Sequence, residues 1–261
     1  MNKIDAIILA GAPADPQMVP EGGLVSRAMI RVGDKTMLQW VVDALRGCSS
    51  IGKILAVGDV TADGLDAVTE PGDDLVANIK RGIEQLDTQE PVLVVSSDIP
   101  LLTAKAVQDF VDRAVPLKAD LAYPIIPKAH CQKRYPQLKR TYLKTADGVF
   151  TGGNLMLLRP EFVSNHWEAV AAAHAARKHV FKLARMIGVG VFLRVIASQL
   201  VPAVISVSAL ERAASRVLGA KVAAVVSAYP EIGEDVDKLS DLEAVRKILL
   251  YERNKQHPQQ S

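Results

Sequence analysis

The stretch AIILAGAPADPQMVPEGG, residues 6–23, decides how the rest of the chain is interpreted. It opens with five apolar residues, 6–10, which are typical of a buried strand, and Gly11 follows them directly. A glycine-rich loop at such a point would bring several backbone N–H groups to a phosphate. The next residues, APADPQ, contain no glycine, and the pair Gly22–Gly23 comes only at the end of the stretch. We therefore expect a first strand that borders a ligand site, with phosphate contacts from the later loop.

A regular alternation of strand-like and helical patterns follows this first strand. Apolar strand-like runs cover 53–58 and 92–97, and helical patterns cover 37–46, 75–86 and 103–113. Strands that are apolar on both faces and separated by helices are typical of a parallel sheet covered on both sides. The sequence thus predicts a three-layer α/β/α, Rossmann-like fold with a mostly parallel mixed sheet.

The second half of the chain is less regular. Extended segments are expected at 120–126, 151–158 and 221–227, and a mainly helical stretch is expected from about 160 to 218. The apolar run 187–210 contains Arg194 and Pro202, which disfavour a membrane span, so we interpret it as a buried helix followed by an extended segment. We see no repeat or low-complexity linker. This favours a single domain, 1–261, with a helical insertion at about 160–218.

Composition limits the classes of function. The chain has 261 residues, 49% of them hydrophobic, and a formal net charge of +2. It is long enough for a sizeable core, and it lacks the basicity of a general nucleic-acid binder. Its two cysteines, Cys48 and Cys131, lie outside any CxxC or Cys/His pattern, which argues against structural zinc and a disulfide framework. We expect a cytoplasmic protein without a nucleic-acid partner.

Four sequence features are expected at one edge of the sheet, because doubly wound folds bind ligands beyond the carboxyl ends of their strands. They are the loop after Leu9, Asp98 after a buried strand, the segment TGGN at 151–154, and the alternating pair Asp235 and Asp237. Carboxylates from two distant segments suit Mg²⁺, which takes oxygen ligands and usually keeps a substrate phosphate. The alternative is an Asx turn at Asp98 and a solvated helix entry at the later pair. Together, the features predict a phosphate and metal site.

Residues 121–146 form a basic segment that contains no acidic residue. Its basic residues are Lys128, Lys133, Arg134, Lys139, Arg140 and Lys144. Two interpretations stay open for them. They form a solvated face, which is the usual role of a charge run, or they hold an anionic acceptor next to the metal site.

Five short motifs follow one another along the chain: IILAG, SRAMIRVGDKTMLQWVVDAL (26–45), SSDIPLL, FTGGNL and DVDKLSDL. In this order they resemble the MobA-like NTP transferases, which are nucleotidyltransferases of the glycosyltransferase-A-type fold. The resemblance covers nearly the whole chain outside residues 160–218. It implies a sheet of the nucleotide-diphospho-sugar transferase type. It also implies magnesium-dependent transfer of a nucleoside monophosphate from an NTP to a sugar phosphate or cofactor-like acceptor, with release of pyrophosphate.

The resemblance also implies roles for single residues. For the nucleotide these are Leu9, Ala10 and Gly11 at its edge, Asn78 near the base or ribose, and Arg27 facing the phosphates in place of the usual lysine. For the metal they are Asp98 and Asp237, with Asp235 beside them, and for the acceptor Gly152, Gly153, Asn154 and Arg140. Arg27 and Asp98 are the expected catalytic residues, because attack on the α-phosphorus depends on positioning and charge neutralisation.

Two alternative functions remain open beside the nucleotidyltransferase. Ala12 replaces the usual second glycine and Arg27 the usual lysine, which is compatible with a nucleotide-binding or regulatory protein without turnover. A glycosyltransferase of the same fold would use a sugar nucleotide as substrate. Against that alternative, the SSD motif at Asp98 offers one acid where a glycosyltransferase typically presents DxD.

The segment 174–194 combines basic and apolar residues at helical spacing. Lys178, Lys182 and Arg185 fall on one face, opposite an apolar face. Such a pattern is typical of a surface helix that covers a core. A second hypothesis is peripheral contact with an anionic membrane or a lipid-phosphate acceptor.

Overall fold

A mixed, mostly parallel sheet forms the centre of the molecule. The computed structural model describes residues 3–19, 26–176, 186 and 188–256. Along the sheet the strands follow the order β5 (Ala67–Thr69), β4 (Ile51–Val57), β1 (Ile4–Leu9), β6 (Val92–Ser96), β10 (Leu155–Leu158), β7 (Leu121–Pro127), β9 (Gly148–Gly152) and β8 (Leu143–Thr145), while β11 (Val222–Val226) pairs with β7. Within these strands only β9 and β10 run against the rest. The predicted sheet type is therefore confirmed.

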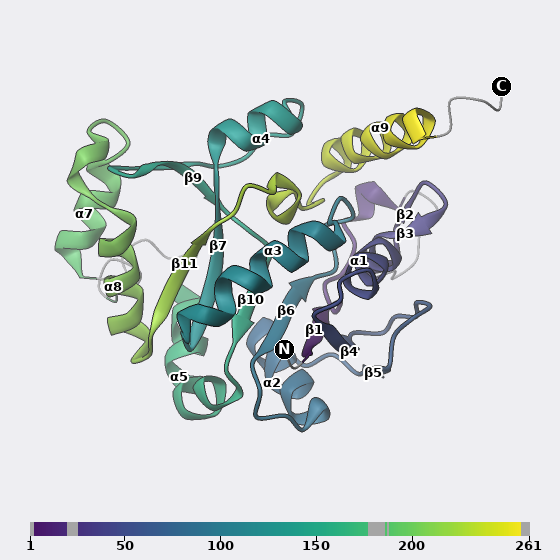
Figure 1. Ribbon diagram of the computed structural model, residues 1–261, viewed down its shortest axis with the longest axis horizontal. Helices are drawn as coiled ribbons and strands as arrows, with labels where there is room; N and C mark the ends of the chain where they lie inside the picture. Colours follow the sequence, from purple (N-terminus) through teal and green to yellow (C-terminus); the bar gives the residue numbers. More distant parts are fainter. Residues whose placement is uncertain (1–2, 20–25, 177–185, 187, 257–261) are drawn as a thin grey trace.

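Helices cover both faces of the sheet, as Figure 1 shows. One core contains buried residues of α1 (Met37–Arg46) and α3 (Ala104–Ala114), and the other contains those of α2 (Leu75–Leu86) and α5 (Pro160–Ala176). Strand β1 contributes to both cores, because its successive side chains point to opposite faces. Ala6 and Ile8 pack with the first core and Ile7 with the second, and all three are fully buried. This confirms the three-layer α/β/α architecture.

Polar side chains mark the starts of the helices that the sequence predicted best. Thr36, Asp74 and Thr103 each accept a hydrogen bond from the backbone N–H three residues later, at the starts of α1, α2 and α3. Such caps satisfy N–H groups that have no partner within the helix. The predicted bounds 37–46 and 75–86 are confirmed, and the third helix covers 104–114 instead of 103–113.

A third core lies beyond the carboxyl ends of the central strands. It joins α9 (Leu239–Gln256) to the hairpin of β2 (Arg31–Val32) and β3 (Lys35–Thr36) and to the short helix η1 (Pro16–Met18). Its buried side chains include Met18, Met37, Val236 and Leu242. In Figure 1, α9 lies at the upper right, above β2 and β3. Through Val236, this core fixes the acidic segment 234–238 against the sheet edge.

The run 151–158, expected as one extended segment, forms two strands. β9 ends at Gly152 and β10 begins at Leu155, because the two residues between them hydrogen-bond to distant segments. Gly153 N donates to Pro124 O at 3.0 Å, and Asn154 N donates to Ile232 O at 2.9 Å. Asn154 O accepts from Ser96 N at 2.9 Å, which brings this break to the end of β6.

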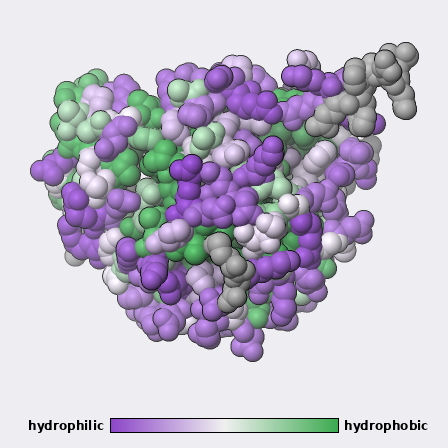
Figure 2. All heavy atoms as spheres, in the orientation of Figure 1, coloured by the Kyte–Doolittle hydropathy of each residue, from purple (hydrophilic) through white to green (hydrophobic). Residues whose placement is uncertain are grey.

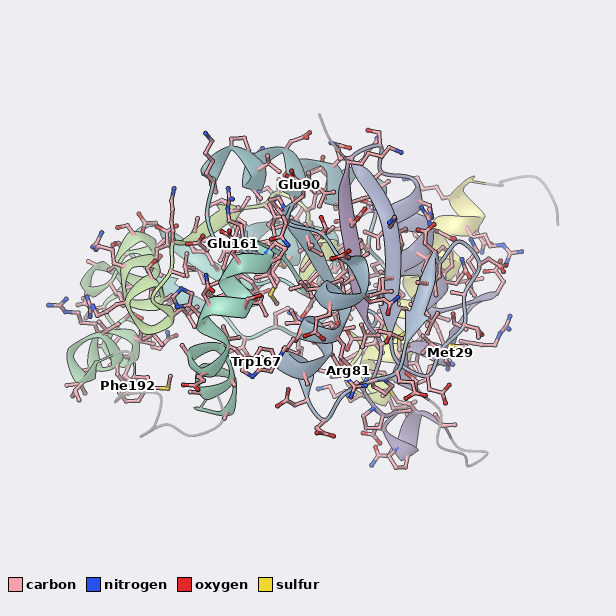
Figure 3. All side chains as sticks on the ribbon, turned by 90° about the horizontal axis from the view of Figure 1, so that it is seen from below. Met29, Arg81, Glu90, Glu161, Trp167 and Phe192 are labelled. Carbon is pink, nitrogen blue, oxygen red and sulfur yellow. The ribbon has the colours of Figure 1, made fainter. Side chains whose placement is uncertain are left out.

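The stretch between β10 and β11 is mainly helical, with α5, α7 (Val189–Ala197), the turn η4 (Pro202–Val204) and α8 (Val207–Leu218). Helix α5 lies beside α2, and Figure 3 shows its Trp167 at their boundary, where the Lys80 ammonium lies 5.3 Å from the ring centroid. No described helix is both long and apolar enough to cross a bilayer.

The expectation that the apolar run 187–210 begins with a buried helix is wrong. None of the residues of α7 is buried, and Val189, Leu193 and Ile196 are between 55% and 62% exposed. Among the described elements, the helix packs chiefly against η4, at the edge of the molecule. Figure 2 shows hydrophobic side chains at this left edge, where α7 lies in Figure 1. The basic residues Lys178, Lys182 and Arg185 lie outside the described residues.

Candidate functional site

The carboxyl ends of β1 and β6 define the floor of the candidate site. These strands pair with Leu9 beside Ser96, and Ser97 N donates to Leu9 O at 3.2 Å. Asp98 follows and is largely buried, with its Oδ1 accepting from Ser96 Oγ at 2.5 Å. Its backbone carbonyl accepts from Val236 N at 2.9 Å, so the acidic segment 234–238 lies directly against it.

Arg27 joins the two carboxylates that the sequence assigned to a metal. Its Nη1 lies 3.2 Å from Asp98 Oδ2 and 2.5 Å from Asp237 Oδ1. Arg27 begins the short helix η2 (Arg27–Met29), and its backbone N–H donates to Ala12 O at 2.9 Å. The Ser26 hydroxyl donates to Ala10 O at 2.7 Å. The chain just after the opening stretch therefore returns to the first strand and delivers Arg27 to the centre of the site.

Asp235 belongs to the same cluster but has a different partner. Its Oδ1 accepts from Arg140 Nη1, and both side chains are more than four-fifths buried. The Asp237 side chain is 63% exposed, and its pKa is raised by partial desolvation and by the nearby Asp235. The pKa of Asp98 is also raised, chiefly by burial, with a contribution from Asp235. Asp235 and Asp237 thus lie in one charged cluster, which is consistent with the alternation predicted for them.

Glu234 is a fourth carboxylate at this site, and the sequence interpretation missed it. It is 1% exposed, and burial raises its pKa to about 7. In an extended segment, alternate residues share a face. Glu234 therefore falls on the face of buried Val236, and Asp235 and Asp237 fall on the other face. The only sequence signal for a buried Glu234 is that Val236, which shares its face in an extended segment, is apolar.

Carboxyl groups outnumber guanidinium groups within the cluster, and Lys139, Lys238 and Asp241 line the adjacent cavity. Four carboxyl groups, those of Asp98, Glu234, Asp235 and Asp237, face two guanidinium groups, those of Arg27 and Arg140. The raised pKa values of Asp98, Glu234 and Asp237 have the direction that excess negative charge and burial produce. A bound cation would relieve this excess.

The donor set fits a hard cation that shares its shell with a ligand. Within the described ranges, no group of three His, Cys, Asp or Glu side chains is arranged to hold a metal by itself. Asp98 and Asp237 nevertheless converge on one nitrogen of Arg27, a position that a cation could take. Mg²⁺ is commonly bound by one or two carboxylates together with substrate phosphates and water. The geometry is therefore that of a substrate-completed site.

The end of β1 and the start of α2, where the resemblance implies the nucleotide, lie side by side. A Cβ added to Gly11 would lie 2.9 Å from Pro71 Cβ and 3.2 Å from Asn78 Nδ2, so only glycine fits here. Asn78 is buried, and its Oδ1 accepts from Gly72 N at 2.6 Å. Ala10 is fully buried, with its N–H donating to Val57 O. Leu9, Ala10, Gly11 and Asn78 are thus brought together, as the resemblance implied. Gly22 and Gly23, the expected phosphate loop, lie outside the described residues.

The glycines Gly152 and Gly153, expected at the acceptor, pack closely against other segments of the protein. A Cβ on Gly152 would lie 2.5 Å from the Tyr123 hydroxyl oxygen, and one on Gly153 would lie 2.6 Å from Ile232 Cγ2. Tyr123 also donates a hydrogen bond to Gly153 O at 2.6 Å. These glycines permit close packing of the protein against itself. Contact between these glycines and an acceptor stays a prediction.

A cavity of about 450 Å³ lies beside the carboxylate cluster. Its lining includes Lys139, Arg140, Thr151, Glu234, Asp235, Asp237 and Lys238. The basic segment, residues 121–146, was interpreted either as a solvated face or as a group that holds an anionic acceptor. Its residues do not all lie in one place. Lys139 and Arg140 face the cavity, whereas Arg134, from α4 (Lys128–Arg134), pairs with Glu252 of α9 at 2.5 Å.

Unused hydrogen-bonding atoms concentrate at this site. Among the described residues, the buried side-chain atoms without a hydrogen-bond partner are Arg27 Nε, Arg140 Nε, Asn154 Nδ2, Glu234 Oε1 and Asp109 Oδ2. All but the last belong to the site. Because buried polar groups are nearly always paired, such a concentration marks a place where a ligand or water completes the structure.

Comparison with known proteins agrees with this geometry. A family model described as the MobA-like NTP transferase domain matches residues 6–194. A hypothetical transferase from Thermus thermophilus is 33% identical with a TM-score of 0.81, and the match covers 92% of this chain and 99% of that one. No curated protein matches the chain.

More distant solved structures share the fold. The 2-C-methyl-D-erythritol 4-phosphate cytidylyltransferase of Thermus thermophilus is 18% identical with a TM-score of 0.54, over 95% of this chain and 98% of that one. A CMP:2-keto-3-deoxy-manno-octonic acid synthetase in complex with CTP is 11% identical with a TM-score of 0.57, over 97% and 100% of the two chains. At these identities the similarity concerns the fold alone.

Proposed function

Because the chain belongs to the MobA-like NTP transferase family and is a nucleotidyltransferase, we propose that it moves a nucleoside monophosphate from an NTP to a small phosphorylated acceptor. Pyrophosphate is the second product. The observation that carries this proposal is the position of Arg27 between Asp98 and Asp237. This cluster separates the nucleotide edge at Gly11 from the cavity that contains Arg140.

The proposed reaction is an in-line displacement at the α-phosphorus. An acceptor oxygen forms the new P–O bond, and the bond from the α-phosphorus to the oxygen that bridges it to the β-phosphorus breaks. The electron pair of that bond leaves with pyrophosphate. Such a reaction depends on positioning and on neutralising the charge of the phosphates.

The residues of the cluster divide this work. In the proposal Asp98 and Asp237, with Asp235 beside them, hold Mg²⁺, which when bound neutralises phosphate oxygens. Arg27 then leaves the two carboxylates and donates hydrogen bonds to the phosphates, where its planar fork matches their oxygens. Asp235 keeps Arg140 oriented in the acceptor cavity.

We place the two substrates on opposite sides of the cluster. Leu9, Gly11 and Asn78 would contact the base and ribose, and Ala10 would support them from within the core. Lys139 and Arg140 would attract the acceptor phosphate. CTP is the first nucleotide to test, because one structural neighbour is a cytidylyltransferase and another contains CTP. We propose the cytoplasm as the compartment, since both cysteines are buried and free.

Pyrophosphate release tests the proposal. Each of the four NTPs is incubated with Mg²⁺ and a panel of sugar phosphates, with the wild type, Asp98→Ala and the control Asp109→Ala. Asp109 pairs with Arg113 on the surface of α3, away from the site. We expect release with at least one substrate pair, retained by Asp109→Ala and lost in Asp98→Ala.

Other outcomes would support the two alternative functions. Tight NTP binding without release would favour a regulatory protein, for which the departures at Ala12 and Arg27 are the argument. Hydrolysis or transfer of a sugar from a sugar nucleotide, without pyrophosphate, would favour a glycosyltransferase.

We retain peripheral membrane contact as a separate proposal, motivated by the exposed apolar side chains of α7. Co-sedimentation with vesicles that contain anionic lipid is expected for the wild type and reduced for Leu193→Asp. Absence of wild-type binding at low salt would exclude this contact.

A further inference from the structure

The two oxygens of the Asp98 carboxylate have different partners. Oδ1 accepts a hydrogen bond from Ser96 Oγ at 2.5 Å, whereas Oδ2 lies 3.2 Å from Arg27 Nη1. Arg27 Nη1 also lies 2.5 Å from Asp237 Oδ1, so Oδ2 faces the position between the two aspartates that a cation could take. One oxygen of Asp98 is therefore held by a neutral hydroxyl, and the other is directed at the charged centre.

Ser96 is itself anchored in the sheet. It is the last residue of β6, which lies between β1 and β10 (Figure 1), and the rest of that strand, residues 92–95, is buried. Ser96 pairs with Leu9 in the register of β1 and β6, and its backbone N–H donates to Asn154 O at 2.9 Å. Asp98 lies two residues beyond this strand end. The hydroxyl of Ser96 therefore connects a side chain in a turn to a residue held on both sides by the sheet.

The backbone of the turn is closed without the Ser96 hydroxyl. Ser97 N donates to Leu9 O at 3.2 Å, and Val236 N donates to Asp98 O at 2.9 Å. These hydrogen bonds fix the path of the chain through Asp98, but they do not select the torsion angles of its side chain. The second side-chain torsion of an aspartate is broad, so the direction of its carboxylate depends on the groups that it contacts. The hydrogen bond from Ser96 acts on this torsion.

We propose that Ser96 is a positioning residue, which keeps Asp98 a single-oxygen ligand and directs its Oδ2 at the metal. Binding through both oxygens would turn the carboxylate and break the hydrogen bond from Ser96. Mg²⁺ requires nearly ideal octahedral geometry, so a carboxylate held in one orientation leaves the other positions to Asp237, substrate phosphates and water. Groups that hydrogen-bond to metal ligands have this orienting effect in other metal sites.

This inference rests on the proposed function for the metal role of Asp98, but its first test needs no turnover. Binding of Mn²⁺ alone is measured by electron paramagnetic resonance of the free ion, without nucleotide. The substitution Ser96→Ala is made both in the wild type and in Arg27→Ala, where no arginine competes with the ion. We expect Ser96→Ala to weaken Mn²⁺ binding about tenfold in each background, as the loss of a partner of a metal ligand predicts.

Two further variants separate positioning from stability. Ser96→Thr keeps the hydroxyl, and we expect its Mn²⁺ affinity to stay within about threefold of the wild type. The matched control is a second hydroxyl–carboxylate pair, in which Thr103 Oγ1 donates to Glu231 Oε1 at 2.9 Å. Thr103 also caps α3, so Thr103→Ala should lower the free energy of unfolding in urea while its Mn²⁺ affinity stays unchanged.

A crystal structure with Mn²⁺ supplies the second test, in which we expect Asp98 Oδ2 on the ion and Oδ1 still on Ser96 Oγ. Contact of both Asp98 oxygens with the ion would overturn the inference. So would an equal or higher Mn²⁺ affinity in Ser96→Ala.

The outcomes also separate this inference from the proposed function. Weaker Mn²⁺ binding in Ser96→Ala, combined with no pyrophosphate release by the wild type, would support the role of Ser96 and count against the proposed function alone. Pyrophosphate release by the wild type, combined with unchanged Mn²⁺ binding in Ser96→Ala, would have the opposite meaning. Absence of Mn²⁺ binding in both the wild type and Arg27→Ala would overturn the metal role of Asp98 and the inference with it.

Discussion

Arg27 shares one nitrogen, Nη1, between the carboxylates of Asp98 and Asp237. A cation bound by the same two carboxylates has to displace it. Two unit charges about 4 Å apart repel by roughly 4 kcal/mol at the effective dielectric constant of a partly exposed protein site. In the proposed site, Arg27 would therefore compete with a metal before the nucleotide binds. Once phosphates are present, arginine and metal stabilise the same bound ligand.

Replacing Arg27 by alanine should separate these two effects. Without NTP, we expect Arg27→Ala to bind Mn²⁺, a spectroscopic substitute for Mg²⁺, at least about tenfold more tightly than the wild type, because displacement of Arg27 relieves only part of the repulsion. Pyrophosphate release should fall by roughly a hundredfold or more, because a charge-stabilising donor is lost. Electron paramagnetic resonance of free Mn²⁺ gives the affinity. Arg113→Ala, which breaks a surface pair on α3, is the control and should match the wild type in both measurements.

The raised pKa of Glu234 predicts how stability depends on pH. The folded protein holds a proton on Glu234 up to about pH 7, whereas the unfolded chain releases it near the ordinary value of 4.5. The resulting stabilisation is complete below about pH 4.5 and is lost as pH rises through about 7. The pKa values of Asp98 and Asp237 shift in the same direction.

We expect urea unfolding of the metal-free wild type to give a larger free energy of unfolding at about pH 5 than at about pH 8. The difference should be smaller in Glu234→Gln, which cannot titrate at this position. Glu231→Gln should keep the wild-type difference. A wild type whose stability increases over this pH range would contradict the assignment.

The sequence predicted the candidate residues of the site better than their partners. Asp98, Asp235 and Asp237 were found because strand ends and alternation are local patterns. The pairing of Arg27 with carboxylates 71 and 210 residues away is a property of the folded chain, as is the pairing of Arg140 with Asp235. Glu234 was missed because burial and loss of a hydrogen-bond partner leave little trace in local sequence.

At the scale of elements, the break between β9 and β10 positions the acceptor side of the site. Gly153 lies where a Cβ would come within 2.6 Å of Ile232 Cγ2 and 2.8 Å of Pro124 Cγ. We expect Gly153→Ala to lower the free energy of unfolding by roughly 1–3 kcal/mol through overpacking.

Gly190→Ala is the matched control for this substitution, since an added Cβ in α7 meets no atom within 4 Å. It should raise stability by roughly 0.5–1 kcal/mol, because alanine favours a helix interior. Chemical denaturation of both variants checks the pair. Equal effects would mean that the break is tolerant and that its glycine is not required by packing.

Elements were predictable where local signals agreed. The bounds of helices α1 and α2 were predicted from apolar periodicity, and in the structure each helix begins at a capping side chain. The break at Gly153 and Asn154 was not predicted, since the hydrogen bonds that cause it come from Pro124 and Ile232. For α7, hydrophobicity predicted burial, but burial requires a facing surface, and the described elements leave every residue of this helix unburied.

At the scale of the whole molecule, the third core connects the last helix to the first third of the chain. Leu242 of α9 is fully buried and packs in the same cluster as Met18, Met37 and Val236. This packing holds Asp235 and Asp237 in place beside Asp98.

We expect Leu242→Ala to cost about 2–5 kcal/mol of stability, as large-to-small changes in a core do. Because the acidic segment is then less firmly held, the apparent affinity for the metal and NTP should also fall. Leu250→Ala in the same helix is the control, since Leu250 is 60% exposed and should change stability by less than about 0.5 kcal/mol. Thermal unfolding and NTP titration measure the two effects. Loss of stability with unchanged NTP binding would mean that the acidic segment is held independently of α9.

The hydrogen bond from Val236 N to Asp98 O has a consequence for the synthesis of the protein. A nascent chain that has emerged from the ribosome as far as β11 already contains Arg27, Asp98 and every strand of the sheet within the described residues. It still lacks Asp235 and Asp237, so Arg27 has one carboxylate instead of two and Arg140 has no partner at position 235. The scaffold can thus assemble during translation, while the charged centre is completed only once Asp235 and Asp237 have followed.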